Sequence, residues 1–518
     1  MKSVAIIGGG ITGLTASFRL QQNNIPVTLY EAGSRVGGII RSARKEGYLA
    51  EFGPNSILET SPKISALICD LGLEGRRRYS NPDAEKRYIV RGGKPVLLPS
   101  SPLEFLGAKL FSMGAKLRLL REPFIRRAPA SADENLAQFV LRRLGQEFLD
   151  YAINPFVAGV YAGDPARLSV IHAFPRLHAL EQEYGSLILG QFLGARKRRR
   201  RCETSKKDAK KFSFDEGLQV LTDTLQAQLP EAIRLESAVL SLQQESGCWT
   251  VTTGSGTTEQ RRRHAAVLFA GPAHKLREIQ LKTDRSLDWS PLGEIYYPPV
   301  ASVVLGFRRE DVAHPLDGFG MLIPEVEGFR ILGALFTSSL FPNRAPAAHV
   351  TLTCYLGGAR APELALLDGE AAVAVALEDL RTLLGVRGQP TFQHHVLFPK
   401  AIPQYEVGFG RFKNLMNEIE ARAPGLFLAG HYRDGISLGD SIVSGDRAAE
   451  RIRDFLTIPS ESSRSKGERI SGSEIARGEP TDRISRCESA LIFPGKIVSG
   501  LTSAAPRFTG PEIEVAGA

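Results

Sequence analysis

The sequence has few cysteines and no long apolar run. Its 518 residues include only five cysteines, which are scattered without a C-x-x-C pair: Cys69, Cys202, Cys248, Cys354 and Cys487. This spacing argues against a disulfide framework and against a zinc site, and no metal ligands are predicted. No stretch of about 18 uninterrupted apolar residues occurs, so the sequence predicts no membrane-spanning helix.

The composition is that of an ordinary globular protein. Apolar residues make up 43% and charged residues 23% of the chain, which excludes collagen, coiled coil and wholesale disorder. The length predicts roughly three domains. Residues 1–3 run directly into a β-rich segment without a cleavable signal before it. We therefore expect a cytoplasmic location.

The net charge of +9 is concentrated in one segment. Residues 196–211 (RKRRRRCETSKKDAKK) hold ten basic and two acidic residues, so the rest of the chain is close to neutral. The segment contains no aromatic residue that would stack on bases, so we do not expect nucleic acid as a partner. Two interpretations stay open, a solvated loop and contact with an anionic membrane surface.

The first thirty residues have the pattern of a βαβ unit that binds a dinucleotide. A β-rich run (Ser3–Ile7), a glycine-rich turn (Gly8–Gly13), a helical run (Leu14–Gln22) and a second β-rich run (Val27–Tyr30) follow one another, and Glu31 ends the last. A glycine triplet alone is weak evidence. Here all the parts occur at the required spacing, which favours a dinucleotide site over a glycine-rich turn with an ordinary surface acid.

Each part of this unit has a physical role. Gly8 permits the tight turn, Gly10 lets a pyrophosphate approach the backbone, and Gly13 lets helix and strand pack closely. The helix N-terminus offers free N–H groups and the positive end of its dipole to the phosphates. Glu31 stands where a carboxylate accepts the hydroxyls of a ribose.

The residues after Glu31 indicate which dinucleotide binds. A second glycine pair, Gly37-Gly38, brings another backbone segment close to the same cofactor, and residues 51–56 (EFGPNS) form a rigid turn. This continuation resembles the FAD-binding flavoproteins of the amine oxidase superfamily, and NAD dehydrogenases do not usually carry it. The resemblance implies FAD as the resident cofactor.

Later segments return to the same domain. Ile233–Leu242, Cys248–Thr253, Ala265–Ala270 and Gly425–Gly430 read as strands, and Ser441–Phe455 reads as a helix. Short apolar runs that alternate with helical patterns favour a largely parallel sheet. The predicted fold class is α/β, with a discontinuous Rossmann-like FAD-binding domain, an α+β substrate domain and an inserted helical domain.

The predicted substrate domain has a different pattern. Short β-like runs occur at Ala301–Phe307, Arg330–Phe336 and Val350–Tyr355, and Leu364–Leu384 reads as a helix. The β-like runs predict an antiparallel sheet.

An apolar stripe marks residues 100–127. Its members recur at steps of three and four residues: Leu106, Leu110, Met113, Leu117, Leu120 and Phe124. Six basic residues surround them. The stripe predicts one helix or two short helices. These either dock on the core or form an amphipathic element that contacts a membrane or flanks an apolar substrate entrance.

These patterns divide the chain into units. The FAD-binding domain takes residues 1–85, 212–285 and 395–456, and the substrate domain takes 86–99 and 286–394. The helical insertion takes 100–211 and ends in the basic loop 196–211. Residues 457–518 are rich in Ser, Gly, Arg and Glu and nearly lack aromatics, so we expect a mostly disordered tail.

Further motifs resemble one family. Residues Asn154–Pro165 (NPFVAGVYAGDP) are similar to a signature of the protoporphyrinogen oxidases. Four more segments fit that family: Tyr297–Val300 (YPPV), Gly318–Pro324 (GFGMLIP), Ala401–Tyr405 (AIPQY) and Ala429–Asp440 (AGHYRDGISLGD). The resemblance covers residues 3–455. His431 departs from it, since an Asn or another small polar residue is expected there, and so does the basic loop.

The resemblance implies a set of site residues. One non-covalent FAD per chain would be held by Gly8, Gly9, Gly10, Ile11, Thr12, Gly13, Glu31, Ala32, Gly37, Gly38, Ile39, Arg41, Gly53, Pro54, Asn55, Ser56, Val239, Ile436, Ser437 and Leu438. The substrate would contact Arg87, Phe319, Gly320, Leu322 and Tyr355. Arg87 would pair with a propionate, Val239 would meet the adenine side through its backbone, and Ile436–Leu438 would face the isoalloxazine.

The resemblance also implies a reaction. Aromatising a porphyrinogen removes six electrons and six hydrogens, so one FAD would turn over three times, taking a hydride at N5 and passing the electrons to O2 to give H2O2. No catalytic side chain is assigned, since pyrrole N–H protons leave as tautomers equilibrate. An apolar slot with one or two cationic anchors suits a flat dicarboxylate.

Several alternatives stay open. Oxidation of coproporphyrinogen III to coproporphyrin III uses the same chemistry but should need more cations for its four propionates. A flavin amine oxidase or polyene desaturase is disfavoured. Amine oxidases typically need an aromatic cage, and the only tryptophans, Trp249 and Trp289, do not lie in the closing segment Ala429–Asp440. A non-catalytic binding protein like the GDP-dissociation inhibitors would not keep the second glycine pair. Peripheral contact with the cytoplasmic face of a membrane and transfer of product to a ferrochelatase are further expectations.

Overall fold

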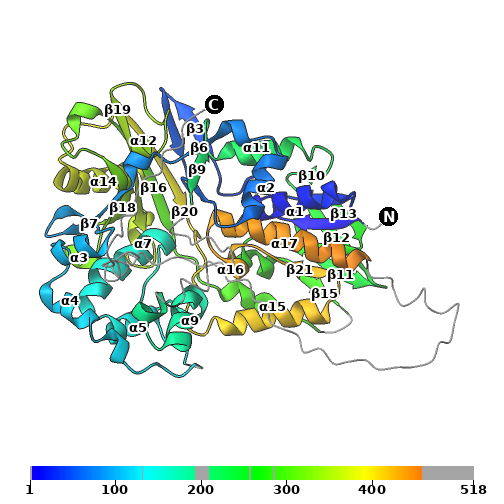
Figure 1. The fold of residues 1–518 in the computed structure, drawn as a ribbon. Helices are drawn as coiled ribbons and strands as arrows, with labels where there is room; N and C mark the ends of the chain where they lie inside the picture. The colour runs from blue at the N-terminus through cyan, green and yellow to red at the C-terminus, as the bar shows by residue number, and fades with distance from the viewer. Residues whose placement is uncertain are drawn as a thin grey trace, which may run out of the picture.

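The computed structural model describes residues 3–130, 132–191, 193, 209–255, 258–283 and 286–457. Predictions for the basic segment 196–208 and for the tail from residue 458 lie outside these ranges. Figure 1 shows two halves, a nucleotide-binding half around α1 (Ile11–Gln22) and α17 (Leu438–Thr457) and a half built on a large mixed sheet, with helices below it.

A five-stranded parallel sheet forms the nucleotide-binding half. Its order is β10-β2-β1-β14-β21, which confirms the predicted parallel sheet. The strands are β1 Val4–Ile7, β2 Val27–Tyr30, β10 Ile233–Arg234, β14 Ala266–Phe269 and β21 Leu426–Leu428. Because successive side chains of a strand alternate between faces, Ile6 packs toward Leu14 and Ile442 of the helices, whereas Ile7 joins the core on the opposite side.

A four-stranded sheet covers that opposite side. It runs in the order β13-β12-β11-β15, with β11 Ala238–Glu245, β12 Cys248–Ser255, β13 Thr258–His264 and β15 Gln280–Lys282. The prediction of a single strand over Ile233–Leu242 is wrong. Glu236 has a positive φ of 50°, which breaks the extended chain and turns it from β10 into a different sheet.

A seven-stranded sheet forms the other half, in the order β20-β16-β19-β18-β17-β7-β8. Its strands are β7 Lys86–Arg91, β8 Lys94–Leu97, β16 Val300–Arg308, β17 Gly318–Leu322, β18 Ile331–Leu335, β19 His349–Gly357 and β20 Phe392–Phe398. The predicted antiparallel pairing is confirmed except at β17, which pairs with β7 in parallel.

Shorter elements connect these sheets. Two small sheets are β3–β4 (Ser42–Lys45, Tyr48–Glu51) and β5–β9–β6 (Ile57–Leu58, Lys211–Phe214, Arg77–Tyr79). The helices outside the helical insertion are α2 Pro62–Asp70, α11 Gln219–Ala227, α12 Thr337–Leu340, α13 Pro362–Ala365, α14 Gly369–Leu384, α15 Gly410–Arg422 and α16 His431–Asp434.

Three predicted boundaries are corrected here. The helix predicted over Leu364–Leu384 is two helices, because Asp368 caps the second by accepting from the Ala371 N–H at 2.8 Å. The first helix begins at Ile11 rather than Leu14, directly after the extended residue Gly10. Lys211, predicted to end a basic loop, instead begins β9.

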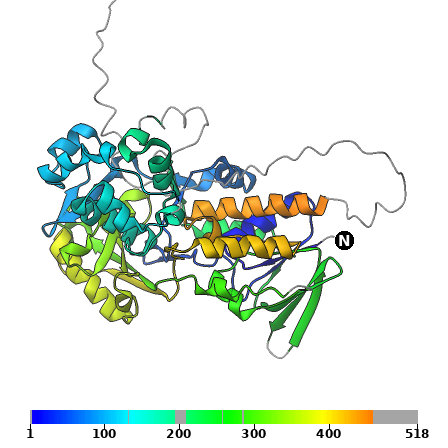
Figure 2. The ribbon, with the colours of Figure 1, turned by 90° about the horizontal axis from the view of Figure 1, so that it is seen from below.

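The helical part of the chain, drawn in cyan and teal, lies at one side of the molecule (Figure 2). It contains α3 Pro102–Gly107, α4 Met113–Leu119, η3 Glu122–Phe124, α5 Leu136–Arg143, α6 Gln146–Phe148, η4 Leu149–Ile153, α7 Asn154–Tyr161, α8 Val170–Ala173 and α9 Pro175–Tyr184. The apolar stripe thus runs along two short helices and η3.

The stripe itself does not dock on the core. Leu110 is buried, but the other five members are 58–89% exposed: Leu106, Met113, Leu117, Leu120 and Phe124. The opposite side of these helices provides the core contacts, through the buried Phe105, Phe111 and Ala115. The interpretation of the stripe as a core-facing surface is therefore wrong.

The division into three domains stays a proposal. It is supported by the sheets, because the five parallel strands come from the three segments assigned to FAD binding and β7, β8 and β16–β19 from those assigned to the substrate. β20 crosses the proposed limit at residues 394 and 395.

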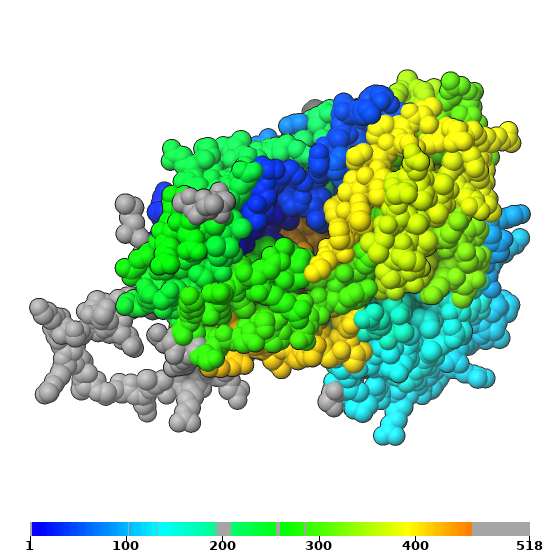
Figure 3. All heavy atoms as spheres, turned by 180° about the vertical axis from the view of Figure 1, so that it is seen from behind, coloured from blue at the N-terminus to red at the C-terminus, as the bar shows by residue number. Residues whose placement is uncertain are grey.

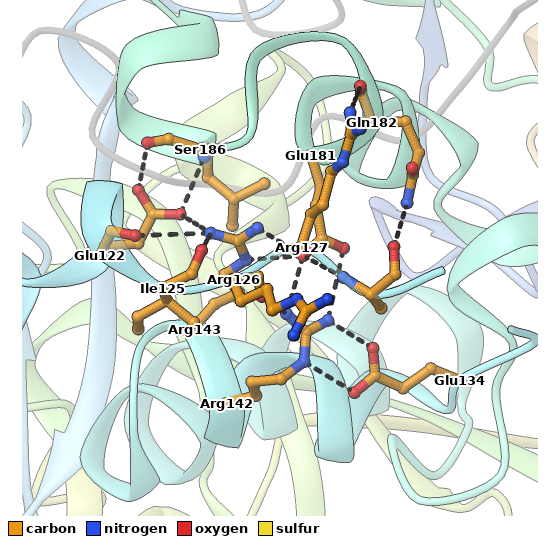
Figure 4. A network of polar contacts seen from close by, with 12 residues as sticks. Glu122, Ile125, Arg126, Arg127, Glu134, Arg142, Arg143, Glu181, Gln182 and Ser186 are labelled. Atoms are coloured by element: carbon orange, nitrogen blue, oxygen red, sulfur yellow. Dashed lines mark hydrogen bonds and ion pairs between the residues drawn. The ribbon is translucent and has the colours of Figure 1, made fainter. Parts of the chain in front are cut away.

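A buried network of charges holds the helical part together (Figure 4). Arg143 is fully buried and forms ion pairs with Glu122 at 3.1 Å and Glu181 at 2.5 Å. Arg142 adds pairs with Glu181 at 2.7 Å and Glu134 at 2.6 Å. The Glu122 carboxylate also accepts from the Leu187 N–H at 2.9 Å. Three elements, η3, α5 and α9, are therefore tied to one guanidinium.

We expect Arg143→Met to destabilise the protein by about 3–5 kcal/mol, because it leaves the buried Glu122 carboxylate without a cation and removes one of the two cations that pair with Glu181. The measurement is the free energy of unfolding from urea titration, followed by circular dichroism. The matched control is Arg422→Met, which removes an exposed pair with Glu418 and should cost less than about 1 kcal/mol. Equal losses for the two variants would contradict the role given to the network.

Candidate active site

The glycine turn after β1 is as tight as the sequence predicts. Gly8 has a φ of +105°, and a Cβ on Gly13 would lie 2.0 Å from the Gly8 carbonyl oxygen. No side chain can therefore replace the hydrogen of Gly13 without moving α1 away from β1. A Cβ on Gly10 would meet nothing within 4 Å, so the backbone is open at the position predicted for a pyrophosphate.

The N-terminus of α1 faces this open position. Gly10 is its N-cap residue, and no side chain caps the helix there. The first N–H groups and the positive end of the helix dipole are thus available to an anion. The described residues fit a dinucleotide phosphate at this point.

Glu31 lies next to the turn, at the end of β2. Its carboxylate accepts from the Gly9 N–H at 2.6 Å and from the Gly33 N–H at 2.8 Å. Each carboxylate oxygen has a second lone pair, so these bonds orient the acid and leave acceptors for ribose hydroxyls. The Ser237 N–H donates to the Glu31 carbonyl at 2.9 Å, which brings the buried Val239 and its strand to the same side.

The second glycine pair lies directly on the first turn. The Gly37 N–H donates to the Gly9 carbonyl at 2.7 Å, and a Cβ on Gly38 would be 3.4 Å from the Gly10 Cα. Arg35 holds this loop by donating to the carbonyls of Val36, Gly38 and Ile40. Two segments that the sequence predicts to share one ligand are therefore in contact.

Helix α17 brings the closing segment Ala429–Asp440 next to the glycine turn and α1. A Cβ on Gly445 would lie 2.3 Å from the Thr12 carbonyl oxygen, and the Thr12 hydroxyl donates to the Ser441 carbonyl at 3.1 Å. Ser437 caps α17, because its Oγ accepts from the Asp440 N–H at 3.1 Å. The predicted residues Ile436, Ser437 and Leu438 thus stand at the start of α17.

The surface is hollowed where these segments meet. In Figure 3, orange atoms of the C-terminal segment lie recessed behind blue N-terminal residues, between green and yellow segments. The hollow is therefore bordered by segments from both ends of the described chain.

One hydrogen-bonded pair joins this region to the seven-stranded sheet. The Tyr355 hydroxyl accepts from Asn55 Nδ2 at 2.7 Å and donates to the Gly53 carbonyl at 3.1 Å. Burial raises the pKa of Tyr355, so the hydroxyl stays protonated. Asn55 Oδ1 is buried and has no partner in the described part of the chain. Such an orphaned acceptor fits a ligand that brings an N–H group.

The predicted substrate residues share neighbouring strands. Leu322, Gly333 and Tyr355 lie opposite one another on β17, β18 and β19, so their Cα–Cβ directions point to one face. Gly333 has no side chain between the other two. A Cβ on Gly159, in the NPFVAGVY helix, would lie 2.3 Å from Leu322 Cδ2, so that glycine lets the helix approach the sheet.

Arg87 on β7 and Phe319 on β17 lie further along the same sheet. Arg87 pairs with Gly320 in the parallel register of β7 and β17. Gly320 has a φ of +149° and its Cβ would lie 2.3 Å from the Ala334 carbonyl oxygen. The Arg87 Cζ is 5.9 Å from the Phe319 ring centroid. Burial lowers the pKa of Arg87, and the charge of Glu85 opposes that effect.

His431, which departs from the family pattern, sits in an aromatic cluster. Its Nε2 is 3.3 Å from the Tyr297 hydroxyl, which accepts from the Ala273 N–H at 3.1 Å. Burial and then the charge of His274 lower the pKa of His431 to about 4, so it is neutral near pH 7. The Tyr405 hydroxyl donates to the His431 carbonyl and accepts from the Gly435 N–H at 3.1 Å.

The predicted residues form two groups that meet at Asn55 and Tyr355. Ile39 is 47% exposed and contributes its carbonyl near Gly53, while Arg41 stacks on Phe52, 4.8 Å from its ring centroid.

Sequence reasoning missed Tyr297 and Tyr405, which position the closing segment. Their place in the YPPV and AIPQY motifs was the signal that could have found them. Among the described residues, no cluster of His, Cys, Asp and Glu could hold a metal.

Comparison with known proteins agrees with this geometry. Residues 11–453 match the family of flavin-containing amine oxidoreductases. Protoporphyrinogen oxidase 2, chloroplastic/mitochondrial, of Arabidopsis thaliana is 37% identical over 480 residues, covering 88% of this chain and 94% of that protein. Coproporphyrinogen III oxidase of Bacillus subtilis (strain 168) is 30% identical over 471 residues, covering 88% and 98%.

A solved structure extends the comparison to the fold. A crystal structure from Exiguobacterium sp. 255-15, of a protein provisionally named protoporphyrinogen oxidase, superposes with a TM-score of 0.72 at 25% identity, covering 88% of this chain and 99% of that one. The fold, the glycine turns and these relatives agree on a flavin-dependent oxidoreductase. The chain belongs to the flavin-containing amine oxidoreductase family, in the branch that holds the protoporphyrinogen and coproporphyrinogen III oxidases.

Proposed function

We propose that the chain binds one FAD non-covalently and oxidises protoporphyrinogen IX to protoporphyrin IX, with three O2 reduced to three H2O2. The observation that carries the proposal is the junction at Tyr355. There the Gly53–Ser56 turn, which is predicted to contact the cofactor, is hydrogen-bonded to Tyr355 on β19. Tyr355 is in register with Gly333 and Leu322 on the neighbouring strands, and Gly333 has no side chain between the other two. A flat apolar molecule beside the flavin fits this arrangement.

The chain's own residues would hold the cofactor in a defined way. The N–H groups at the start of α1 and the open backbone at Gly10 would take the pyrophosphate, and Glu31 would accept from the ribose. The orphaned Asn55 Oδ1 would accept an N–H of the ring, and the start of α17 would place a positive dipole end beside it.

The protein's part in the reaction is to orient and to exclude water. Bound FAD would supply the hydride acceptor and pass the electrons to O2. Arg87 would fix the acid end of the substrate, while Leu322 and Tyr355 would hold the ring system against the cofactor turn. The neutral His431 and the protonated Tyr355 hydroxyl add no charge to the slot, so an apolar ring enters without displacing a counter-ion.

Oxidation of coproporphyrinogen III is the second candidate, since the Bacillus subtilis relative carries that name. Its four propionates would require cations around the whole ring, whereas the predicted slot residues include one cation, Arg87. That difference favours the dicarboxylate.

The decisive test supplies both porphyrinogens to the purified protein and follows porphyrin fluorescence and O2 uptake. We expect protoporphyrinogen IX to give the higher kcat/KM, with three O2 consumed per porphyrin. Acid treatment should release free FAD, which chromatography separates from FMN. A colourless protein that no added FAD reconstitutes, or a higher kcat/KM for coproporphyrinogen III, would refute the proposal as stated.

Arg87→Ala should raise KM for protoporphyrinogen IX by about tenfold or more, because a charge-assisted contact with a propionate contributes roughly 1.5–3 kcal/mol. Steady-state kinetics with matched flavin content is the measurement. Arg91→Ala is the control, since that cation on the same strand already pairs with Glu147 at 2.6 Å. An unchanged KM for both porphyrinogens in Arg87→Ala would remove Arg87 from the anchor role.

Peripheral contact with a membrane is a separate part of the proposal. The helices α3 and α4 lie at one edge of the molecule (Figure 1). Their segment exposes apolar residues together with five basic ones: Lys109, Arg118, Arg121, Arg126 and Arg127. Such a mixture suits an anionic lipid surface. No helix among the described residues is long and apolar enough to cross a membrane. A cytoplasmic location and transfer of product to a ferrochelatase stay predictions.

Flotation with lipid vesicles tests the contact. Wild type should float with vesicles containing phosphatidylglycerol and less with pure phosphatidylcholine. Leu120→Glu combined with Phe124→Glu should abolish flotation, since it puts two carboxylates on the contacting surface. Leu366→Glu, at another residue that is 61% exposed, is the control and should float like wild type. Flotation of the double variant at the wild-type level would exclude this surface.

A further inference from the structure

Two cations meet over one aromatic ring beside the proposed slot. The Lys211 Nζ lies 5.6 Å from the Phe319 ring centroid, and the Arg87 Cζ lies 5.9 Å from the same centroid. Arg87 belongs to β7 and Lys211 to β9, which are strands of different sheets. Tertiary folding therefore places two positive charges close together that are remote in the sequence.

Neither cation has an acidic partner. Within the described ranges, no hydrogen bond or ion pair of the Arg87 or Lys211 side chain is present. Neighbouring cations differ in this respect. Lys86 pairs with Asp317 at 2.5 Å, and Arg77 pairs with Glu59 at 3.2 Å. Lys86 and Arg77 thus each have an acidic partner, whereas Arg87 and Lys211 have none among the described residues.

Leaving Arg87 and Lys211 without acidic partners costs electrostatic free energy. Both side chains are partly buried. Burial, followed by the charge of Arg87, lowers the pKa of Lys211, and the exposed Glu85 counteracts this without pairing with either. Two like charges in a partly desolvated place repel each other, and an anion bound between them would remove that repulsion. The arrangement is therefore one that favours an acidic ligand.

The position of Lys211 connects it to both parts of the site. Leu58 pairs with Lys211 in the small sheet, and β5 directly follows the Gly53–Ser56 turn of the cofactor region. Phe319, the ring under both cations, precedes Gly320, which pairs with Arg87. Lys211 thus lies between the cofactor turn and the substrate strands, on the side where Arg87 lies.

We propose that Lys211 is a second carboxylate anchor, which acts with Arg87 and Phe319 to bind the acid side chains of the tetrapyrrole and so favours a substrate with its carboxylates on one side. This inference rests on the proposed function of the site. Arg87 offers a planar guanidinium with donors in a fixed arrangement, and Lys211 adds an ammonium group on a flexible side chain. Two cations at one edge match a molecule whose two propionates are neighbours.

The test compares wild type with Lys211→Met, Lys211→Arg and Lys210→Met. Lys211→Met keeps the length of the side chain and removes its charge, so KM for protoporphyrinogen IX should rise about tenfold while kcat changes less than about twofold. Lys211→Arg should keep KM within about twofold. Lys210→Met is the matched control, because that exposed neighbour lies over Tyr79, 5.1 Å from its ring centroid, and should behave like wild type.

The dimethyl ester of protoporphyrinogen IX separates a charge effect from a structural one. It lacks the carboxylates, so wild type and Lys211→Met should oxidise it with equal KM. A KM for the free acid that does not change in Lys211→Met would overturn the inference, and so would a rise of the same size for acid and ester. If Lys211→Met failed to retain flavin, Lys211→Gln would be measured in the same way.

This design distinguishes the two levels of the proposal. A wild-type protein that oxidises neither porphyrinogen refutes the proposed function. Normal oxidation by wild type, with equal KM for the free acid in wild type and Lys211→Met, refutes the second anchor alone.

Discussion

Close backbone packing around the first glycine turn is the constraint on which the site depends. Gly13 must lie against the Gly8 carbonyl, and Gly445 must lie against the Thr12 carbonyl, each at a distance that leaves no room for a Cβ. The first contact sets α1 on β1, and the second sets α17 on α1. Residues near the two ends of the described chain thereby enclose one volume, and the open backbone at Gly10 is what remains for the ligand.

The same site leaves polar groups unpaired where a ligand would satisfy them. Asn55 Oδ1 is buried without a partner, and Arg87 and Lys211 have no acidic neighbour in contact. The buried Arg143 of the helical part, by contrast, is paired with both Glu122 and Glu181. Because an unpaired buried polar group costs free energy, the unpaired groups at this site support ligand binding rather than stability.

The helical part combines a rigid interior with an apolar exterior. Inside, the network around Arg143 ties η3, α5 and α9 together. Outside, Leu120 and Phe124 are 70% and 89% exposed, on helices whose other sides are packed. An element that is held together from within can keep apolar side chains exposed without unfolding.

The sequence by itself determined the local parts. The spacing of Gly8, Gly10, Gly13 and Glu31 requires a strand, a turn and a helix within one short stretch. The backbone contacts that fix these elements join residues close together in the sequence. Short apolar runs likewise predicted the parallel strands, and the steps of three and four residues predicted the two short helices. Only the tertiary structure decided where distant segments meet, such as Asn55 with Tyr355 or Lys211 with Arg87. It also decided which face of α4 is exposed. Periodicity defines an apolar face but not the surface that covers it, and side chains from separate strands become neighbours only through sheet order and packing.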